Sequence, residues 1–306
     1  MVLYILRRLA ISIPTMLFIA LLTFWLMDIA PGDPFDMERP MPEIVRENIE
    51  AKYNLDKPFF TRFFLYISNF VQGDLGPSFV YNDFSVTQLV SSSWSVSAHI
   101  GILAFVIAVP LGITLGTLAA LNRNTSLDYF LMTFAMTGVV IPTFVLAPIL
   151  VMIFSIQLGW LPAGGWEGGQ TPYLILPVVT MVIGSVASIA RVMRGSMIET
   201  LNQPYIRTAK AKGLSTSYIL FRHALRPSLI PVVAMLGPAF VYIITGSVII
   251  DIFFSTGGMG QHFVSGALNR DYGLVMGITL IIATLTILFT LVVDILYTLI
   301  DPRIRL

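Results

Sequence analysis

The sequence predicts an all-α polytopic membrane protein with six transmembrane helices, because its composition is strongly apolar and its charged residues leave six long gaps. Of the 306 residues, 56% are hydrophobic and only 11% are charged, and the mean hydropathy is +0.83. A soluble domain has about a quarter of its residues charged. The composition therefore excludes a soluble enzyme, a disordered chain and a nucleic-acid-binding protein. The chain has no cysteine, which excludes a disulfide or a thiolate site but leaves the redox compartment open.

Six stretches free of Asp, Glu, Lys and Arg can cross a bilayer core about 30 Å thick, which needs roughly 20 helical residues. They lie within residues 9–27, 96–122, 129–154, 173–190, 227–250 and 273–293. The first stretch follows Arg7 and Arg8, as the apolar part of a cleaved signal peptide would. Asp28 and Pro31 do not suit a cleavage after Ala30, so we expect an uncleaved span.

The distribution of basic residues predicts the orientation, because Lys and Arg accumulate on the cytoplasmic side of a membrane. Six spans place both termini on one side. Five of the six basic residues on the opposite side lie in one long loop, which counts little toward this rule. Both termini are therefore expected to be cytoplasmic, since their side carries most of the 18 Lys and Arg residues: Arg7, Arg8, Arg123, Arg191, Arg194, Arg207, Lys210, Lys212, Arg222, Arg226, Arg303 and Arg305.

The outer connection, residues 30–95, is too long for a simple turn and contains nine acidic and five basic residues. Its segment 42–53 predicts a polar helix. Its aromatic segment 59–70 suits a helix that lies on the membrane or covers the outer mouth of the bundle. The alternative is a small packed cap with no contact role.

The inner connection, residues 191–226, begins with a short predicted helix. Asn202 or Gln203 can cap a helix that starts at Pro204, because proline at the first helical position loses no needed hydrogen-bond donor. Gly213 ends this helix, with two lysines in its last turn facing the negative end of the helix dipole.

A second predicted helix follows at once. Ser215 is its candidate N-cap, and the helix runs to Leu225 and ends at Pro227. Four of its residues lie on one face of the helix, because they are spaced three and four apart: Tyr218, Phe221, Arg222 and Leu225. Taken alone, this basic amphipathic loop more often indicates a helix on the lipid surface.

The spans lack the ionisable residues of an ion-driven carrier, in which buried carboxylates or histidines usually relay protons. Asp28, Asp251 and Asp294 lie close to the span ends, and His99 lies near the outer end of the second span. Asp294 is placed to pair with an inner arginine as a structural anchor. Sodium coupling at broken helices stays open, because several prolines could kink a span: Pro110, Pro142, Pro148, Pro177 and Pro238.

The sequence offers no nucleotide, metal or catalytic site of its own. It contains no Gly-Lys-Ser/Thr of a P-loop, so any ATP would have to act through a partner. His99, His223 and His262 show no metal-binding spacing. The serines at 91–93 have no base nearby in the sequence. We therefore expect a membrane protein that is not an enzyme and binds no cofactor.

The inner connection also carries a pattern specific to one family of transporters. The run from Tyr205 to Ser215 is Tyr-Ile-Arg-Thr-Ala-Lys-Ala-Lys-Gly-Leu-Ser. It closely resembles the cytoplasmic loop of ABC-importer permeases, which has an E-A-A, three residues, then G pattern. Ala209 and Gly213 match this pattern. Glu and Ala are replaced here by Arg207 and Thr208, and a proline of the family is replaced by Arg226; such replacements are typical of the branch that imports di- and oligopeptides and, in some members, nickel.

The resemblance extends over nearly the whole chain. Residues 255–260, Ser-Thr-Gly-Gly-Met-Gly, depart from the family pattern, which has Trp-Pro before the glycines. Five other motifs are similar to those of the branch's first permease subunit: Ala-Pro-Gly-Asp-Pro at 30–34, Gly-Asp-Leu-Gly at 73–76, Leu-Gly-Trp-Leu-Pro-Ala at 158–163, Asn-Arg-Asp-Tyr at 269–272 and Asp-Pro-Arg-Ile-Arg at 301–305.

The resemblance implies the type I ABC-importer transmembrane fold in the plasma (inner) membrane of a prokaryote. Residues 1–95 would then give the first span (about 9–29) and the outer loop. Residues 96–300 would give a five-helix core with a coupling loop at about 194–226, and residues 301–306 a cytoplasmic tail. The implied coupling residues are Arg207, Thr208, Ala209, Lys210, Lys212, Gly213, Leu214 and Ser215. The candidate outer-gate residues are Asp251, Gly257, Gly258 and Gly260.

The implied partners are a second homologous permease, two ATP-binding subunits and an extracytoplasmic solute-binding protein. A peptide is the expected substrate, with nickel or an oligosaccharide as alternatives. A different class, the self-sufficient secondary carrier or channel, stays open. The small residues within the spans suit either close helix packing or a wide passage: Gly112, Gly116, Gly138 and Gly184.

Overall fold

The computed structural model describes residues 2–29, 54, 56–81, 83–245 and 248–300. The predicted polar helix at 42–53 and the tail at 301–306 lie outside these residues. The described chain is almost entirely helical, in this order: α1 (Val2–Asp28), α3 (Phe59–Val71), α4 (Val86–Leu121), α5 (Ser126–Val140), α6 (Thr143–Leu150), the π-helical η1 (Val151–Gln157), the 3₁₀ turn η2 (Glu167–Gly169), α7 (Thr171–Leu201), α8 (Pro204–Ala211), α9 (Thr216–Ile219), the π-helical η3 (Leu220–Ala224), α10 (Leu225–Ile244), α11 (Val248–Phe253), α12 (Met259–Leu268) and α13 (Tyr272–Ile300).

Five segments are long and apolar enough to cross a membrane: Ala10–Asp28, Val86–Leu121, Thr171–Leu201, Thr216–Phe253 and Tyr272–Ile295. A sixth crossing requires α5 to be joined with α6 and η1, which are bent by 102° relative to it. The predicted stretch 129–154 is therefore not one straight helix. The break has a local cause: Ile141 is extended (φ −87°, ψ 114°) before Pro142, as sterics before proline favour.

Two helices extend beyond the predicted spans. Helix α4 begins at Val86 instead of near Val96, behind a capping box in which Ser85 and Gln88 exchange hydrogen bonds of 3.0 and 3.2 Å. Helix α7 continues past Ala190 to Leu201, so the first residues of the loop expected at 194–226 are helical. A charge-free stretch therefore predicts that a helix is present, but not where the helix begins or ends.

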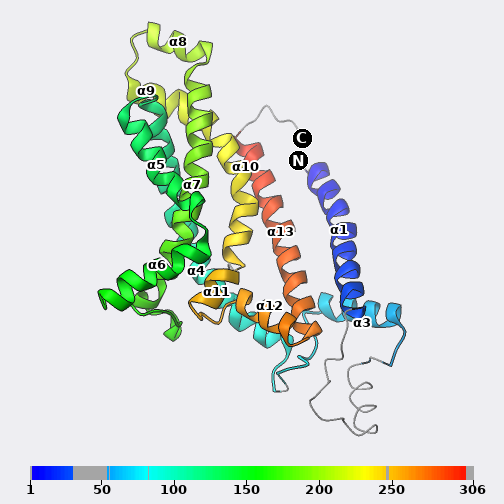
Figure 1. Ribbon diagram of the computed structural model, residues 1–306. Helices are drawn as coiled ribbons and strands as arrows, with labels where there is room; N and C mark the ends of the chain where they lie inside the picture. Colours follow the sequence, from blue (N-terminus) through cyan, green and yellow to red (C-terminus); the bar gives the residue numbers. More distant parts are fainter. Residues whose placement is uncertain (1, 30–53, 55, 82, 246–247, 301–306) are drawn as a thin grey trace.

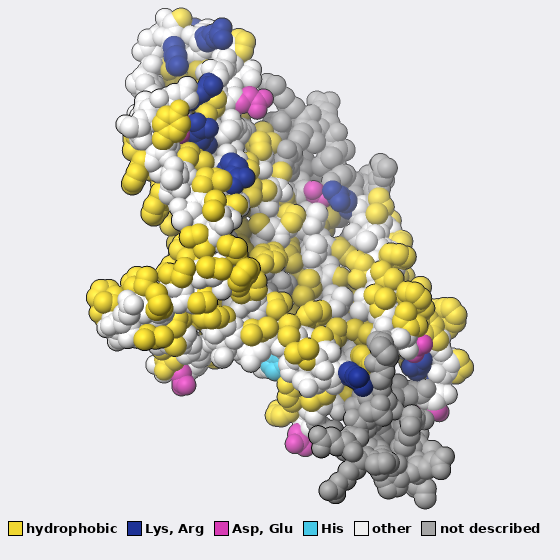
Figure 2. All heavy atoms as spheres, viewed as in Figure 1, with side chains coloured by type: hydrophobic (Ala, Val, Ile, Leu, Met, Phe, Trp, Pro, Cys, Tyr) yellow, Lys and Arg dark blue, Asp and Glu magenta, His cyan; other side chains and the backbone are white. Residues whose placement is uncertain are grey.

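The helices are arranged between two distinct ends of the molecule (Figure 1). Helices α8 and α9 lie at one end, called here the α8 end, and α3, α11 and α12 lie at the opposite α11 end. Helix α1 begins and α13 ends at the α8 end. Figure 2 shows basic side chains gathered at the α8 end and many hydrophobic side chains across the middle of the visible face.

Helix α1 is held at the edge of the bundle by an ion pair near each of its ends. Arg8 contacts Asp294 of α13 at 2.9 Å, which confirms the arginine partner predicted for Asp294. Asp28 pairs with Arg62 of α3. Between them, many large side chains of α1 are exposed. The predicted aromatic helix at 59–70 is confirmed as α3, and Phe63 is its buried side chain.

Helices α4 and α7 pack so closely that glycine is needed at their contact. A Cβ on Gly116 would lie 2.5 Å from the carbonyl oxygen of Ala190, and one on Gly112 would lie 2.7 Å from Ile189. On α5, a Cβ on Gly138 would lie 2.1 Å from the carbonyl oxygen of Ile183. Of the two roles open for these glycines, the structure supports close packing.

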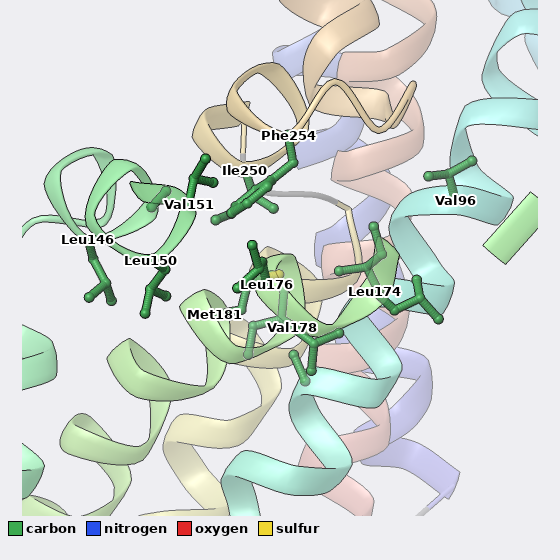
Figure 3. Packing of buried hydrophobic residues seen from close by; sticks show 14 residues of the cluster. Val96, Leu146, Leu150, Val151, Leu174, Leu176, Val178, Met181, Ile250 and Phe254 are labelled. Atoms are coloured by element: carbon green, nitrogen blue, oxygen red, sulfur yellow. The ribbon is translucent and has the colours of Figure 1, made fainter. Parts of the chain in front are cut away.

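At each end of the molecule, an apolar cluster packs several helices together. At the α8 end, Met193 and Met197 of α7 pack with residues of α8, α9 and α10. At the α11 end, Ile250 and Phe254 pack against α6, η1 and the start of α7. Figure 3 shows Ile250 and Phe254 directed toward Leu176 of α7, with Val151 of η1 beside them.

Candidate functional site

The α8 elbow, defined as residues 204–219, has the geometry that the sequence predicts. Pro204 begins α8 and Gln203 has the extended backbone of an N-cap (φ −65°, ψ 148°), which places the cap at Gln203 and not at Asn202. Gly213 has φ +75°, and its N–H donates to the Lys210 carbonyl at 2.9 Å. The next N–H, of Leu214, donates to the Ala209 carbonyl at 3.3 Å, which completes a Schellman motif.

The second helix of the elbow starts as predicted but does not end where predicted. Ser215 caps it by accepting a hydrogen bond from the Tyr218 N–H at 3.4 Å. The helix then continues through η3 into α10, so the expected end at Pro227 is wrong. The wide π-helical turn explains this, because the N–H of Leu225 donates to the carbonyl of Leu220 and the helix takes up a new register just before the proline.

The elbow has one buried and one exposed face. Ile206 is 0% exposed and Ala209 is 7% exposed, and both pack in the apolar cluster around Met193 and Met197. Ala209, one of the predicted coupling residues, therefore packs α8 against the bundle and does not face outward. The other predicted coupling residues are exposed: Arg207, Thr208, Lys210, Lys212, Gly213, Leu214 and Ser215. The elbow thus presents a solvent-facing surface whose charged residues are all basic, on a buried apolar base.

The Asp251 knot, defined as Asp251, Ser97, Thr256, Gly258, Met259 and Gly260, occupies the α11 end. Asp251 is 1% exposed. Its Oδ1 accepts a hydrogen bond from the Thr256 hydroxyl at 2.7 Å. Its Oδ2 accepts from the Gly260 N–H at 3.0 Å and from the Ser97 hydroxyl at 3.3 Å. A buried carboxylate needs such donors, and these three come from α4, from the turn after α11 and from α12.

The atoms around Gly258 and Gly260 leave no room for a side chain at these two positions. A Cβ on Gly258 would lie 2.4 Å from Asp251 Oδ1, and one on Gly260 would lie 2.6 Å from the Cα of Val248. Gly257 instead has φ +75°, and its N–H donates to the Gln261 side chain at 3.0 Å. The structure therefore brings three of the four predicted gate residues into direct contact and places Gly257 in the turn beside them.

Two polar contacts, one in the knot and one between α5 and α7, escaped the sequence analysis. Ser97 accepts a 2.9 Å hydrogen bond from the Met259 N–H while it donates to Asp251. Asp128 of α5 binds Arg194 of α7 through two hydrogen bonds of 2.7 Å. The only local signal was the N-cap pattern at Thr125, which accepts from the Asp128 N–H at 3.4 Å. The partners themselves lie too far away in sequence to be found from spacing.

Asp271 joins the outer loop to the start of α13. It is 0% exposed and accepts hydrogen bonds from the Phe79 N–H at 3.1 Å and the Leu274 N–H at 3.2 Å. Nearby, the His262 ring of α12 contacts the Tyr81 ring at 6.2 Å between centroids. Burial lowers the pKa of His262, because a charged imidazole is poorly solvated there.

Comparison with known proteins identifies the family. The model described as "Binding-protein-dependent transport system inner membrane component" matches residues 112–306, which include the elbow and most of the knot. The chain belongs to this family. The oligopeptide transport system permease protein OppB of Haemophilus influenzae is 57% identical over 302 residues, which cover 99% of each chain. The dipeptide transport system permease protein DppB of Bacillus subtilis is 42% identical over 303 residues, which cover 99% of this chain and 98% of that protein.

Solved structures share the fold of this binding-protein-dependent permease. An inward-facing form of the MetNI methionine ABC transporter gives a TM-score of 0.57 at 16% identity, covering 70% of this chain and 97% of that chain. An amino acid ABC transporter gives a TM-score of 0.52 at 17% identity, covering 71% and 95%. These neighbours confirm the predicted all-α fold, in the helix arrangement that the two transporters share. The predicted resemblance to the family is confirmed as well.

Proposed function

We propose that this chain is a permease subunit of an ABC importer and forms half of the membrane passage for di- or oligopeptides. The observation that carries the proposal is the exposed face of the α8 elbow on its buried apolar base. The names of the relatives, oligopeptide and dipeptide permeases, support a peptide as the substrate. The other half of the passage would be a second homologous permease.

The elbow is the proposed contact for an ATP-binding subunit. Its exposed residues offer a partner both charge and apolar surface: Leu214 is 37% exposed and Tyr218 is 51% exposed. Two such subunits would bind and hydrolyse ATP, so this chain needs no cofactor of its own. Their movement on ATP binding would shift the elbow and with it α7, and the bundle would alternate between outward and inward openings.

The Asp251 knot is the proposed outer gate. It ties α11 and α12 to α4 at the end of the molecule opposite the elbow, where an extracytoplasmic solute-binding protein would deliver its peptide. With six crossings, counting bent α5 and α6 as one, both termini lie on the elbow side. Because the exposed basic residues of the elbow favour the cytoplasmic side, the termini are cytoplasmic in a bacterial inner membrane.

Reconstitution tests the transport role directly. In liposomes, the complete complex with a second permease, two ATP-binding subunits and a binding protein should accumulate labelled peptide only when ATP is present. The purified chain alone should accumulate none under a proton or sodium gradient. Accumulation by the chain alone would establish the secondary carrier and overturn the proposal.

A matched pair of surface substitutions tests the docking face. Leu214→Arg adds a charge at the elbow, and Leu268→Arg adds the same charge at a 79% exposed site at the opposite end of the molecule. We expect Leu214→Arg to reduce co-purification of the ATP-binding subunits and Leu268→Arg to leave it unchanged. Equal co-purification of both variants would show that the elbow is not the docking site.

A further inference from the structure

An ion pair joins α5 to α7 near the α8 end, and the mechanism above does not use it. The Arg194 guanidinium donates from Nε to Asp128 Oδ1 and from Nη2 to Asp128 Oδ2, both at 2.7 Å. Asp128 is 1% exposed and also accepts from the Asn124 N–H at 2.9 Å. A two-pronged contact of this kind fixes the orientation of both partners as well as their distance.

On the α7 side, this pair connects directly to the elbow. Arg194 lies between Met193 and Met197, both 0% exposed, and these methionines pack in the cluster that holds Ile206 of α8. From Arg194 to the end of α7 is about 10 Å, or two helical turns. A displacement of the elbow must therefore move the Arg194 backbone.

On the α5 side, the chain leads to the outer knot. Helix α5 runs to the break at Ile141, beyond which α6 packs Leu146 and Leu150 in the cluster that contains Ile250 and Phe254. Ile250 lies in α11 directly before Asp251, and Phe254 directly follows this helix; Figure 3 shows the packing of both. The continuous segment from α5 to α6 thus begins at the ion pair and ends at the residues that pack against Ile250 and Phe254.

We propose that Asp128 and Arg194 are positioning residues that transmit movement of the α8 elbow through α5 and α6 to the Asp251 knot. This inference rests on the proposed function. With the pair in place, α5 has to follow α7 when the elbow moves. Without it, α5 is joined to α7 by packing alone, as at Gly138 and Ile183, so part of the movement of α7 does not reach the outer knot and more ATP is hydrolysed for each opening of the passage.

The test measures peptide uptake per ATP hydrolysed in the complete complex reconstituted in liposomes. Asp128→Asn keeps the size of the side chain and removes its charge, and Arg194→Lys keeps the charge and removes the two-pronged geometry. Both variants should assemble and hydrolyse ATP, while uptake per ATP falls by about fivefold or more, the lower range of coupling between distant sites. A purely structural role would lower the amount of complex without changing this ratio.

The ion pair between Arg8 and Asp294 supplies the control, because it joins α1 to α13 and bypasses α5. Asp294→Asn should leave uptake per ATP unchanged. An unchanged ratio in Arg194→Lys overturns the inference, and so does an equal fall in Asp294→Asn. If Asp128→Asn does not assemble, Arg194→Lys decides the outcome. Failure of the proposed function is distinguishable, because it would show in the unmodified complex as uptake that does not require ATP.

Discussion

The α8 elbow and the Asp251 knot are both turns built around glycine, and they need that glycine for opposite reasons. Gly213 in the elbow has φ +75°, and a Cβ there would meet none of the described atoms within 4 Å. In the knot, a Cβ on Gly260 would lie 2.6 Å from the Cα of Val248. The elbow therefore needs glycine for its backbone angle, and the knot needs it for space.

The polar groups of the two regions differ in the same way. Arg207, Lys210 and Lys212 of the elbow are exposed, whereas Asp251 of the knot is buried and bound by three internal donors. The elbow is thus open to a contact with another molecule, and the knot is complete within the chain. We expect substitutions at the elbow to act on partner binding and substitutions in the knot to act on folding.

The largest effect should come from Gly260→Ala. The new methyl group would overlap backbone atoms and push against the Asp251 carboxylate, costing about 3 kcal/mol of unfolding free energy, the upper range for added core atoms. Thermal unfolding in detergent measures this loss. Gly195→Ala is the control, since a Cβ on Gly195 meets none of the described atoms within 4 Å and should leave the unfolding temperature unchanged or higher. Equal unfolding temperatures for the two variants would contradict the proposed lack of space.

Asp251→Asn should have the next largest effect. The amide places N–H groups where one carboxylate oxygen now accepts, which leaves at least one buried donor unpaired, at a cost of about 2 kcal/mol. Thr256→Ser keeps the hydroxyl and serves as the control in the same thermal unfolding experiment. If Asp251→Asn proves as stable as Thr256→Ser, the carboxylate charge does not organise the knot.

Gly213→Val should act mainly on partner binding. A β-branched residue in the left-handed region costs about 1–2 kcal/mol, and this strain falls on an exposed turn. We expect the ATP-binding subunits to co-purify less well, with a smaller fall in unfolding temperature than in Gly260→Ala. Gly213→Asn is the control, because asparagine tolerates this conformation at a helix end. Identical losses in both variants would place the cause in the side chain and not in the backbone angle.

The smallest effect should be a pH dependence at His262. Its pKa is lowered in the folded state by burial, so the unfolded state takes up a proton first as the pH falls below about 6.5. Stability from this residue is therefore full above that pH and is lost as the pH falls toward the lower, folded-state value. His262→Gln should flatten this part of the stability profile between pH 7 and pH 5. An unchanged profile would rule out His262 as its cause.

The apolar stretches and the elbow were predictable because their signals are local. A charge-free stretch predicts a span from its own residues, and the Pro204, Gly213 and Ser215 pattern fixes two helix starts and one helix end. The prediction failed at Pro227, because a π-helical turn just before the proline changes the hydrogen-bond register. The identity of a residue does not reveal such a turn.

The knot and the size of the α5–α6 bend were not predictable because they depend on distant packing. Ser97 and Asp251 are 154 residues apart, and Asp128 and Arg194 are 66 residues apart. Pro142 predicts a break, but the 102° angle is consistent with the packing of α6 against α11, which no spacing encodes. The candidate gate could be named from its glycines and aspartate, whereas its hydroxyl partner on α4 could not.

The two ion pairs of α1 also set a length. Arg8 and Asp28 are separated by about 30 Å along a helix, which equals the thickness of the hydrocarbon layer of a typical bilayer. A thinner or thicker bilayer must tilt this helix or pull on its ends. The ion pairs to α13 and α3 lie near the two ends of this helix, so they are the contacts that a change in bilayer thickness would strain first.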